Sequence, residues 1–109
     1  MITCTDKKLP TYQIFGERLH INFDEKEVTV QNFDGHERIA YEYVTSVSTT
    51  HSDRSALIND IIRSQYNIAD EFALINNAQE KPEQYAKYQA FRVQAKALAD
   101  NWIAQLQGV

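Results

Sequence analysis

Three histidines and one cysteine are the side chains best suited to bind a transition metal or to act as a nucleophile. His20, His36 and His51 are far apart in the sequence, and Cys4 lies near its start. Their spacings match no compact ligand pattern of the kind found in zinc sites. No base or helix amino terminus is evident beside Cys4 to activate its thiol. The sequence therefore predicts ordinary histidines, a free thiol, no metal and no cofactor.

Carboxylates and hydroxyls give no catalytic pattern either. Asp24, Glu25 and Glu27 are close together, but they lack the alternating oxygen donors and central glycine of a calcium loop. Ser55 lies in no nucleophile elbow, and the sequence has no glycine-rich loop that would hold a phosphate. We therefore expect a protein that is not an enzyme.

Aromatic side chains are the other chemically distinctive group, since Phe, Trp and Tyr make up 11% of the sequence. Tyr85, Tyr88, Phe91 and Trp102 recur at helical spacing near the carboxyl end. Two interpretations stand: they pack as core against a sheet, or they form an exposed interaction surface, where Tyr and Trp are enriched. The second makes a protein partner or self-association the expected function.

Residues 53–79 offer an alternative, because two helical pieces with a tight junction are also typical of a helix-turn-helix. A small DNA-binding regulator would use this unit to contact bases and phosphates. Only Arg54 and Arg63 are basic in it, and its second helix would present Asp70 and Glu71 to the DNA. Nucleic acid is therefore the less favoured partner.

Composition sets the class of protein in which these residues act. The chain has 109 residues, 43% of them apolar, and a net charge of -4, which suits one domain over residues 1–109 and opposes bulk phosphate binding. No apolar run is long enough for a signal segment or a membrane span. With a single cysteine, no internal disulfide forms, and we expect a cytoplasmic protein without membrane contact.

The first half of the chain has the period-two pattern of β-strands. Leu19, Ile21 and Phe23 alternate with polar residues, and similar alternation runs through residues 28–30 and 39–47, with a shorter strand near 12–15. Turns are expected at Gly16-Glu17, in the polar stretch 24–27 and at Asp34-Gly35. The pattern predicts an antiparallel β-meander of three or four strands over residues 1–50.

The second half has helical periodicity. Asp53 or Ser52 is a suitable N-cap, and Asn67 with Asp70 is close to a capping box. The apolar stripes on either side of Tyr66-Asn67 are in phase, as in one helix, so we predict a kink or a one-residue interruption there. Both stripes are expected to face the core.

A last helix is predicted from Pro82 to about Gln107, because proline suits a first helical position. Residues 53–79 match it in length, so the two are expected to fold back on each other near 79–82. The predicted fold class is α+β, with the N-terminal meander followed by a C-terminal helical hairpin over residues 51–109 and one long last helix.

Residues 57–99 resemble small accessory proteins encoded in the tail or virion regions of prophages of gut bacteria. The resemblance rests on Ile61-Ile62-Arg63, Tyr66, Asp70-Glu71, Ala73-Leu74-Ile75, Pro82-Glu83, Tyr85, Tyr88, Phe91-Arg92 and Ala95-Lys96. It implies an accessory or structural role through protein contact, without catalysis, and assigns no role to individual residues.

Overall fold

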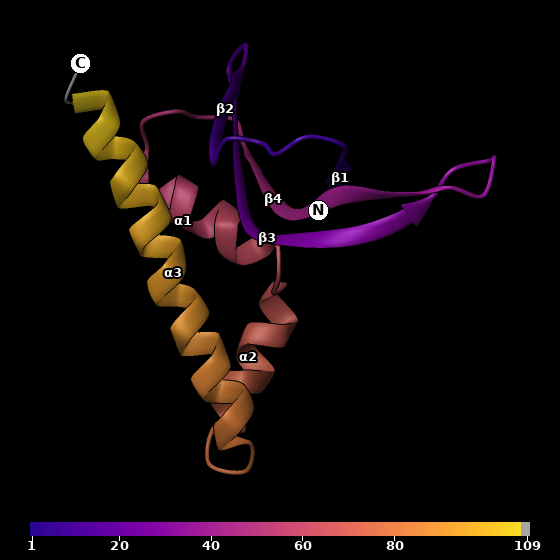
Figure 1. Ribbon diagram of the computed structural model, residues 1–109. Helices are drawn as coiled ribbons and strands as arrows, with labels where there is room; N and C mark the ends of the chain where they lie inside the picture. The colour runs from indigo at the N-terminus through magenta and orange to yellow at the C-terminus, as the bar shows by residue number, and fades with distance from the viewer. Residues whose placement is uncertain (108–109) are drawn as a thin grey trace.

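The computed structural model describes residues 1–107 as four strands followed by three helices (Figure 1). The elements are β1 (Ile2–Thr5), β2 (Tyr12–Phe15), β3 (Arg18–Gln31), β4 (Glu37–Ser48), α1 (Arg54–Arg63), α2 (Ile68–Asn76) and α3 (Pro82–Gln107). The predicted α+β class is confirmed, as are an antiparallel sheet in the first half and a long last helix.

The sheet has the order β1-β4-β3-β2, with every neighbouring pair antiparallel. The predicted meander is its β2-β3-β4 part. The alternation did not reveal β1, which pairs with β4 through Ile2↔Val44 to Thr5↔Tyr41 and completes a Greek-key order. The connection from β1 to β2 is held by polar contacts: the Leu9 backbone N–H donates to the Tyr43 hydroxyl at 2.9 Å.

The turn expected at residues 24–27 is wrong, because β3 continues through them. The register with β4 shifts between Phe23 and Lys26, and Asp24 has a φ of 53°, so this stretch forms a β-bulge. Asp is among the few residues that adopt such a backbone readily. Beyond the bulge, β3 and β4 continue as a two-stranded ribbon that projects from the body (Figure 1). It ends at the predicted Asp34-Gly35 turn, where Gly35 has a φ of 86°.

One face of the sheet packs against α1 and α3. The core is made of residues from these three parts, namely Leu19, Ile21, Phe23, Val44, Leu57, Ile61, Ile62, Phe91, Ala95, Ala99 and Trp102. Burial of their apolar surface is the main stabilising contribution to the fold, at about 25 cal/mol per Å².

A full break separates α1 from α2, so the predicted kink or one-residue interruption is wrong. α1 ends at Arg63, and Asn67 takes an extended conformation with φ -83° and ψ 173°. Its side chain accepts from the Asp70 backbone N–H at 2.7 Å, and its own N–H donates to the Asp70 carboxylate at 3.3 Å. This predicted capping box starts a new helix in a new direction, because a capping residue cannot itself be helical.

The three helices do not form the simple two-helix hairpin that the sequence predicted. α1 and α2 each pack beside part of α3, and α2 with the start of α3 descends from the body as a leg (Figure 1). The radius of gyration is 16.4 Å, against about 13 Å for a compact domain of this length. The ribbon and the leg account for this extended shape.

Candidate interaction surface

The aromatic residues of α3 lie largely inside the protein. Tyr88, Phe91 and Trp102 are 1%, 9% and 8% exposed, while Tyr85 is half-buried. The Trp102 indole N–H donates to the His51 carbonyl at 2.6 Å. These three rings belong to the core, so the exposed-surface interpretation does not hold for them.

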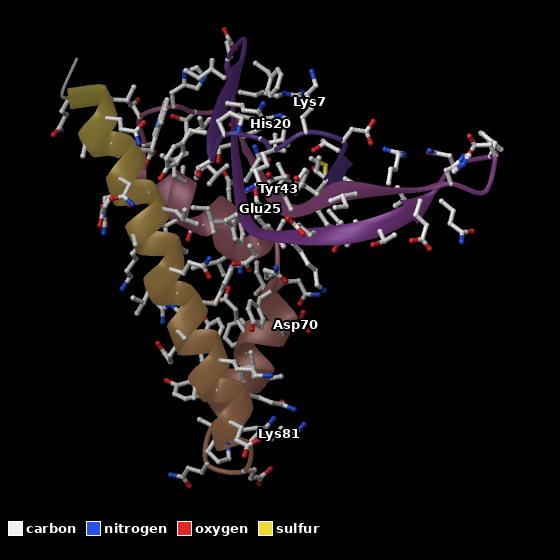
Figure 2. All side chains as sticks on the ribbon, in the orientation of Figure 1. Lys7, His20, Glu25, Tyr43, Asp70 and Lys81 are labelled. Carbon is white, nitrogen blue, oxygen red and sulfur yellow. The ribbon has the colours of Figure 1, made fainter. Side chains whose placement is uncertain are left out.

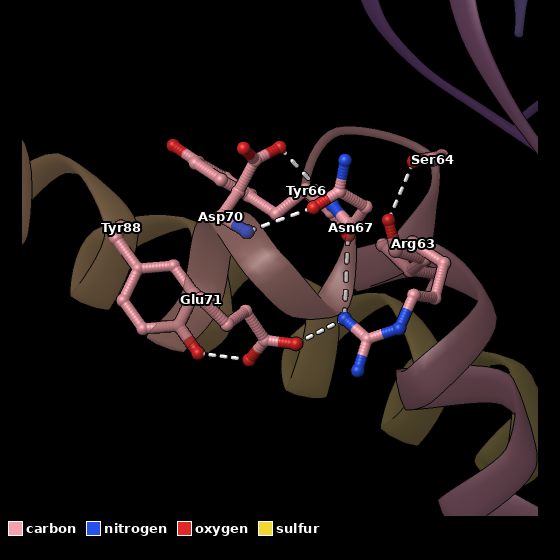
Figure 3. A network of polar contacts seen from close by, with 8 residues as sticks. Arg63, Ser64, Tyr66, Asn67, Asp70, Glu71 and Tyr88 are labelled. Atoms are coloured by element: carbon pink, nitrogen blue, oxygen red, sulfur yellow. Dashed lines mark hydrogen bonds and ion pairs between the residues drawn. The ribbon is translucent and has the colours of Figure 1, made fainter. Parts of the chain in front are cut away.

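Tyr88 also takes part in a polar network that joins all three helices (Figure 3). Its hydroxyl donates to one oxygen of the Glu71 carboxylate, and the other oxygen pairs with the Arg63 guanidinium. The same Arg63 nitrogen donates to the Tyr66 carbonyl at 3.3 Å. The network fixes the position of α2 relative to α1 and α3.

The network shifts two pKa values in opposite directions. The Tyr88 hydroxyl, followed by the Arg63 guanidinium, lowers the pKa of the Glu71 carboxyl against the opposing effect of burial. Burial, followed by the hydrogen bond to Glu71, raises the pKa of Tyr88. Both shifts favour a charged carboxylate that accepts from a neutral tyrosine at neutral pH.

In contrast to the buried aromatic residues of α3, apolar side chains on the outer side of α2 face solvent. Ile68, Phe72 and Ile75 are 59%, 63% and 51% exposed, and α2 has no buried residue at all within residues 1–107. Their spacing of four and three places them on one helix face, which we call the α2 stripe. The expectation that this stripe faces the core is wrong, because the break before Asn67 redirects the helix.

A groove runs beside the α2 stripe. It has a volume of about 230 Å³ and is lined by the stripe residues together with Arg63 and Glu71. The sequence signal that could have revealed this surface is the capping box at Asn67 directly before the apolar stripe. A capping box starts a separate helix, so the stripes of α1 and α2 need not point in the same direction even though they are in phase in the sequence.

A second exposed apolar region lies on the projecting ribbon. Phe33 is fully exposed next to the turn, and Ile39 is 57% exposed. The two edges of the ribbon beyond β1 and β2 carry charged side chains such as Glu27 and Arg38, which is a common protection against strand pairing. The ribbon is therefore the less suitable of the two regions for a stable interface.

The outer face of the sheet carries a tight polar cluster (Figure 2). The Tyr43 hydroxyl donates to Glu25 at 2.6 Å, Lys8 lies 3.9 Å from the same carboxylate, and Asn22 accepts from the Thr45 hydroxyl at 2.8 Å. Burial, followed by the bond to Glu25, raises the pKa of Tyr43. These contacts fasten the β1–β2 connection to the sheet.

The residues considered for metal binding lie in separate places. His20 packs against the Phe15 ring at 4.6 Å between centroids, and His36 contacts Asp34 at 2.9 Å. Cys4 is exposed on β1. Within residues 1–107, no group of three or more His, Cys, Asp and Glu side chains is placed to hold a metal ion.

The two basic residues of the proposed DNA-binding unit are both paired with carboxylates. Arg54 contacts Asp100 on α3, and Arg63 contacts Glu71. Asp70 serves the capping box at the start of α2. The start of α2, which would be the recognition helix of a helix-turn-helix, is therefore acidic, as the sequence indicated.

Comparison of the chain with models of known protein families, with curated proteins and with solved structures gave no match. None of the helices within residues 1–107 combines the length and the apolar character needed to cross a bilayer.

Proposed function

We propose that this protein is not an enzyme and acts through contact with a protein surface, as a component of an assembly. The observation that carries the proposal is the α2 stripe, a helix face of three large apolar side chains that points into solvent. An exposed apolar patch flanked by polar side chains is typical of an interaction site.

The size of α2 supports this proposal. The helix has nine residues, and a helix of that length is marginal in water without tertiary packing. Its neighbours hold it by the Arg63–Glu71–Tyr88 network and by partly buried side chains along one edge only. Covering the α2 stripe with a partner would supply the missing apolar burial.

The resemblance of residues 57–99 to prophage-encoded accessory proteins supports an accessory role in a phage-like assembly as the finer form of this proposal. The identity of the neighbouring genes tests it, since tail or capsid genes would agree with it. The alternative, a DNA-binding regulator, gains no support from Arg54 and Arg63, because both are paired with carboxylates.

Photo-crosslinking in the producing cell tests the proposed contact directly. A photoreactive phenylalanine analogue at position 72 should give a discrete protein adduct, because Phe72 lies at the centre of the α2 stripe. The control is the same analogue at Val93, which is 67% exposed on α3 and lies outside the stripe. If position 72 gives no more adduct than position 93, the proposed function is wrong.

A further inference from the structure

The core of the protein contains no residue from α2 or from the connection that follows it. Every residue of the core cluster lies on β3, β4, α1 or α3, and Tyr66 is the last side chain before α2 that packs against the cluster. Residues 67–81, which we call the α2 segment, contain no fully buried residue. Detaching this segment would therefore leave the core cluster, and the apolar burial that stabilises it, in place.

The backbone also separates the α2 segment from its neighbours. Asn67 is extended, so the hydrogen-bond ladder of α1 does not continue into α2. At the other end, the Lys81 backbone N–H donates back to the Asn77 carbonyl at 2.9 Å, before α3 begins at Pro82. Within residues 1–107, no backbone hydrogen bond joins α2 to α1 or α3. The helix can therefore move away without breaking the ladder of either neighbour.

One carboxylate makes all the side-chain hydrogen bonds and ion pairs that join the α2 segment to the rest of residues 1–107. The Tyr88 hydroxyl of α3 donates to one oxygen of Glu71, and the Arg63 guanidinium of α1 pairs with the other (Figure 3). The contacts between Asn67 and Asp70 lie inside the segment. Hydrogen bonds to a charged group contribute more than those between neutral groups, so Glu71 dominates the polar attachment of α2.

The apolar attachment of the α2 segment is small by comparison. Leu74 and Ala78 are its only half-buried apolar residues, while the α2 stripe faces solvent. A helix of nine residues needs tertiary packing to persist in water. Without the contacts of Glu71, α2 would keep little that holds it against α3.

From these observations we infer that the α2 segment opens as a local unit while the body stays folded, and that Glu71 is the clasp that keeps it closed. Elements with few buried contacts open at a lower free energy than the whole protein. The inference goes beyond the proposed function, because it concerns the chain alone and needs no partner. It also implies that the α2 stripe is presented to a partner only while the clasp is closed.

Hydrogen exchange of the purified full-length chain, followed by NMR at individual amides at pH 7, tests the local opening. Amides inside α2 should exchange about 100-fold faster than those of α1, relative to their intrinsic rates. Low concentrations of urea should accelerate exchange in α1 and not in α2, because a local opening exposes little new surface. Equal rates and equal urea dependence in the two helices would overturn the inference.

Glu71→Gln tests the clasp. The amide lacks the charge that attracts Arg63 and strengthens the bond from Tyr88, so exchange in α2 should accelerate about 10-fold. Glu80→Gln is the matched control, because Glu80 is an exposed residue of the same segment. It should change the rate by less than about threefold. If Glu71→Gln changes the rate no more than Glu80→Gln does, Glu71 is not the clasp.

Ile61→Val distinguishes a local opening from a general loss of stability. Ile61 is fully buried in the core, so the loss of a methyl group should accelerate exchange in α1 about fivefold through global unfolding. The rate in α2 should stay the same, because Ile61 remains packed in both the closed and the locally open state. Equal acceleration in both helices would mean that α2 opens only when the whole chain unfolds, and would overturn the inference.

These measurements are separate from the crosslinking that tests the proposed function. A chain without local opening that still gives an adduct at position 72 would refute this inference and retain the proposed function. A chain whose α2 opens locally but gives no adduct would do the reverse.

Discussion

Two serine hydroxyls are buried on the face of the sheet that packs against the helices. Ser46 and Ser48 are each 1% exposed and face inward beside Val44. Within residues 1–107, neither hydroxyl has a hydrogen-bond partner. A buried hydroxyl without a partner lowers stability, because water bonded to it in the unfolded chain.

We therefore expect Ser48→Ala to raise the free energy of unfolding by about 1 kcal/mol, and Ser46→Ala to have a similar effect. Urea unfolding followed by circular dichroism measures the change. Thr45→Ala is the contrasting variant, because the Thr45 hydroxyl donates to Asn22 at 2.8 Å. It should lower stability by about 1 kcal/mol, and a loss of stability in Ser48→Ala would contradict the prediction.

Glu71 gives a prediction on pH dependence. Its pKa is lowered in the folded protein from an ordinary value of 4.5, so the folded state holds the carboxylate better than the unfolded chain does. The resulting stability is present above the unfolded pKa and is lost as pH falls through the folded one. At pH 7, Glu71→Gln should cost about 1–2 kcal/mol, and the gap to the wild type should shrink as the pH falls below about 4.

Urea unfolding of both proteins from pH 7 to pH 3 tests this expectation. Glu80→Gln is the matched control, because Glu80 is exposed in the connection between α2 and α3. It should change stability by less than about 0.5 kcal/mol. A gap between Glu71→Gln and wild type that stays constant over the whole range would exclude a role for the charge of Glu71.

Among the elements, β3 depends on a single unusual residue. Asp24 has a φ of 53° at the bulge, and its carboxylate accepts from the Gln94 side chain at 2.9 Å. A β-branched residue at such a φ is strained by about 1–2 kcal/mol. Asp24→Val should therefore lower the free energy of unfolding by about 2 kcal/mol. Asp24→Asn is the control, because asparagine tolerates the same backbone conformation and keeps an acceptor for Gln94. Its thermal midpoint should match that of the wild type. Equal losses of stability in the two variants would refute this role for the bulge.

The same bulge shows where the sequence stops predicting the fold. Alternation at Leu19, Ile21 and Phe23 correctly indicates a half-buried strand. The polar residues 24–27 look like a turn, because a bulge and a turn both favour Asp and both interrupt alternation. Only the pairing of residues 26–31 with residues 37–42 of β4 distinguishes them, and the alternation within one strand does not show which residues that strand pairs with.

For the helices, the sequence predicts where α2 begins but not the direction in which it runs. The Asn67 capping box is local, so the sequence predicts it correctly. The direction of α2 depends on contacts with the other helices, namely those of Glu71 with Arg63 on α1 and Tyr88 on α3. Ile68, Phe72 and Ile75 form the same apolar pattern whether they face a core or a partner, so the pattern alone led to the wrong expectation that they are buried. For the same reason, the sequence left the aromatic residues of α3 open between the core and an exposed surface.

At the scale of the whole molecule, the protein is a small body with two projections. Its extents are 50 × 42 × 19 Å, and the body contains the entire core cluster. The leg carries the α2 stripe and is tied to the body by a charged network, whereas the ribbon beyond the bulge consists mostly of exposed side chains. The two projections should therefore differ in what they contribute to folding and to association.

Shortening the ribbon tests this division. Residues 30–38 can be replaced by Asn-Gly, because Thr29 and Ile39 are paired across the strands and a two-residue turn suits such a pair. The deletion removes exposed or half-exposed side chains and two surface pairs, Asp6–Arg38 and Asp34–His36, and keeps the buried Ala40. The free energy of unfolding should change by less than about 1 kcal/mol, since exposed ion pairs contribute little.

The shortened chain should also keep its crosslinked adduct at position 72, because the α2 stripe is untouched. Urea unfolding of the purified chain and photo-crosslinking in the cell measure the two quantities. A large loss of stability would mean that the ribbon supports the body. A fold that stays intact while the adduct at position 72 is lost would move the interface from the leg to the ribbon, where Phe33 lies fully exposed.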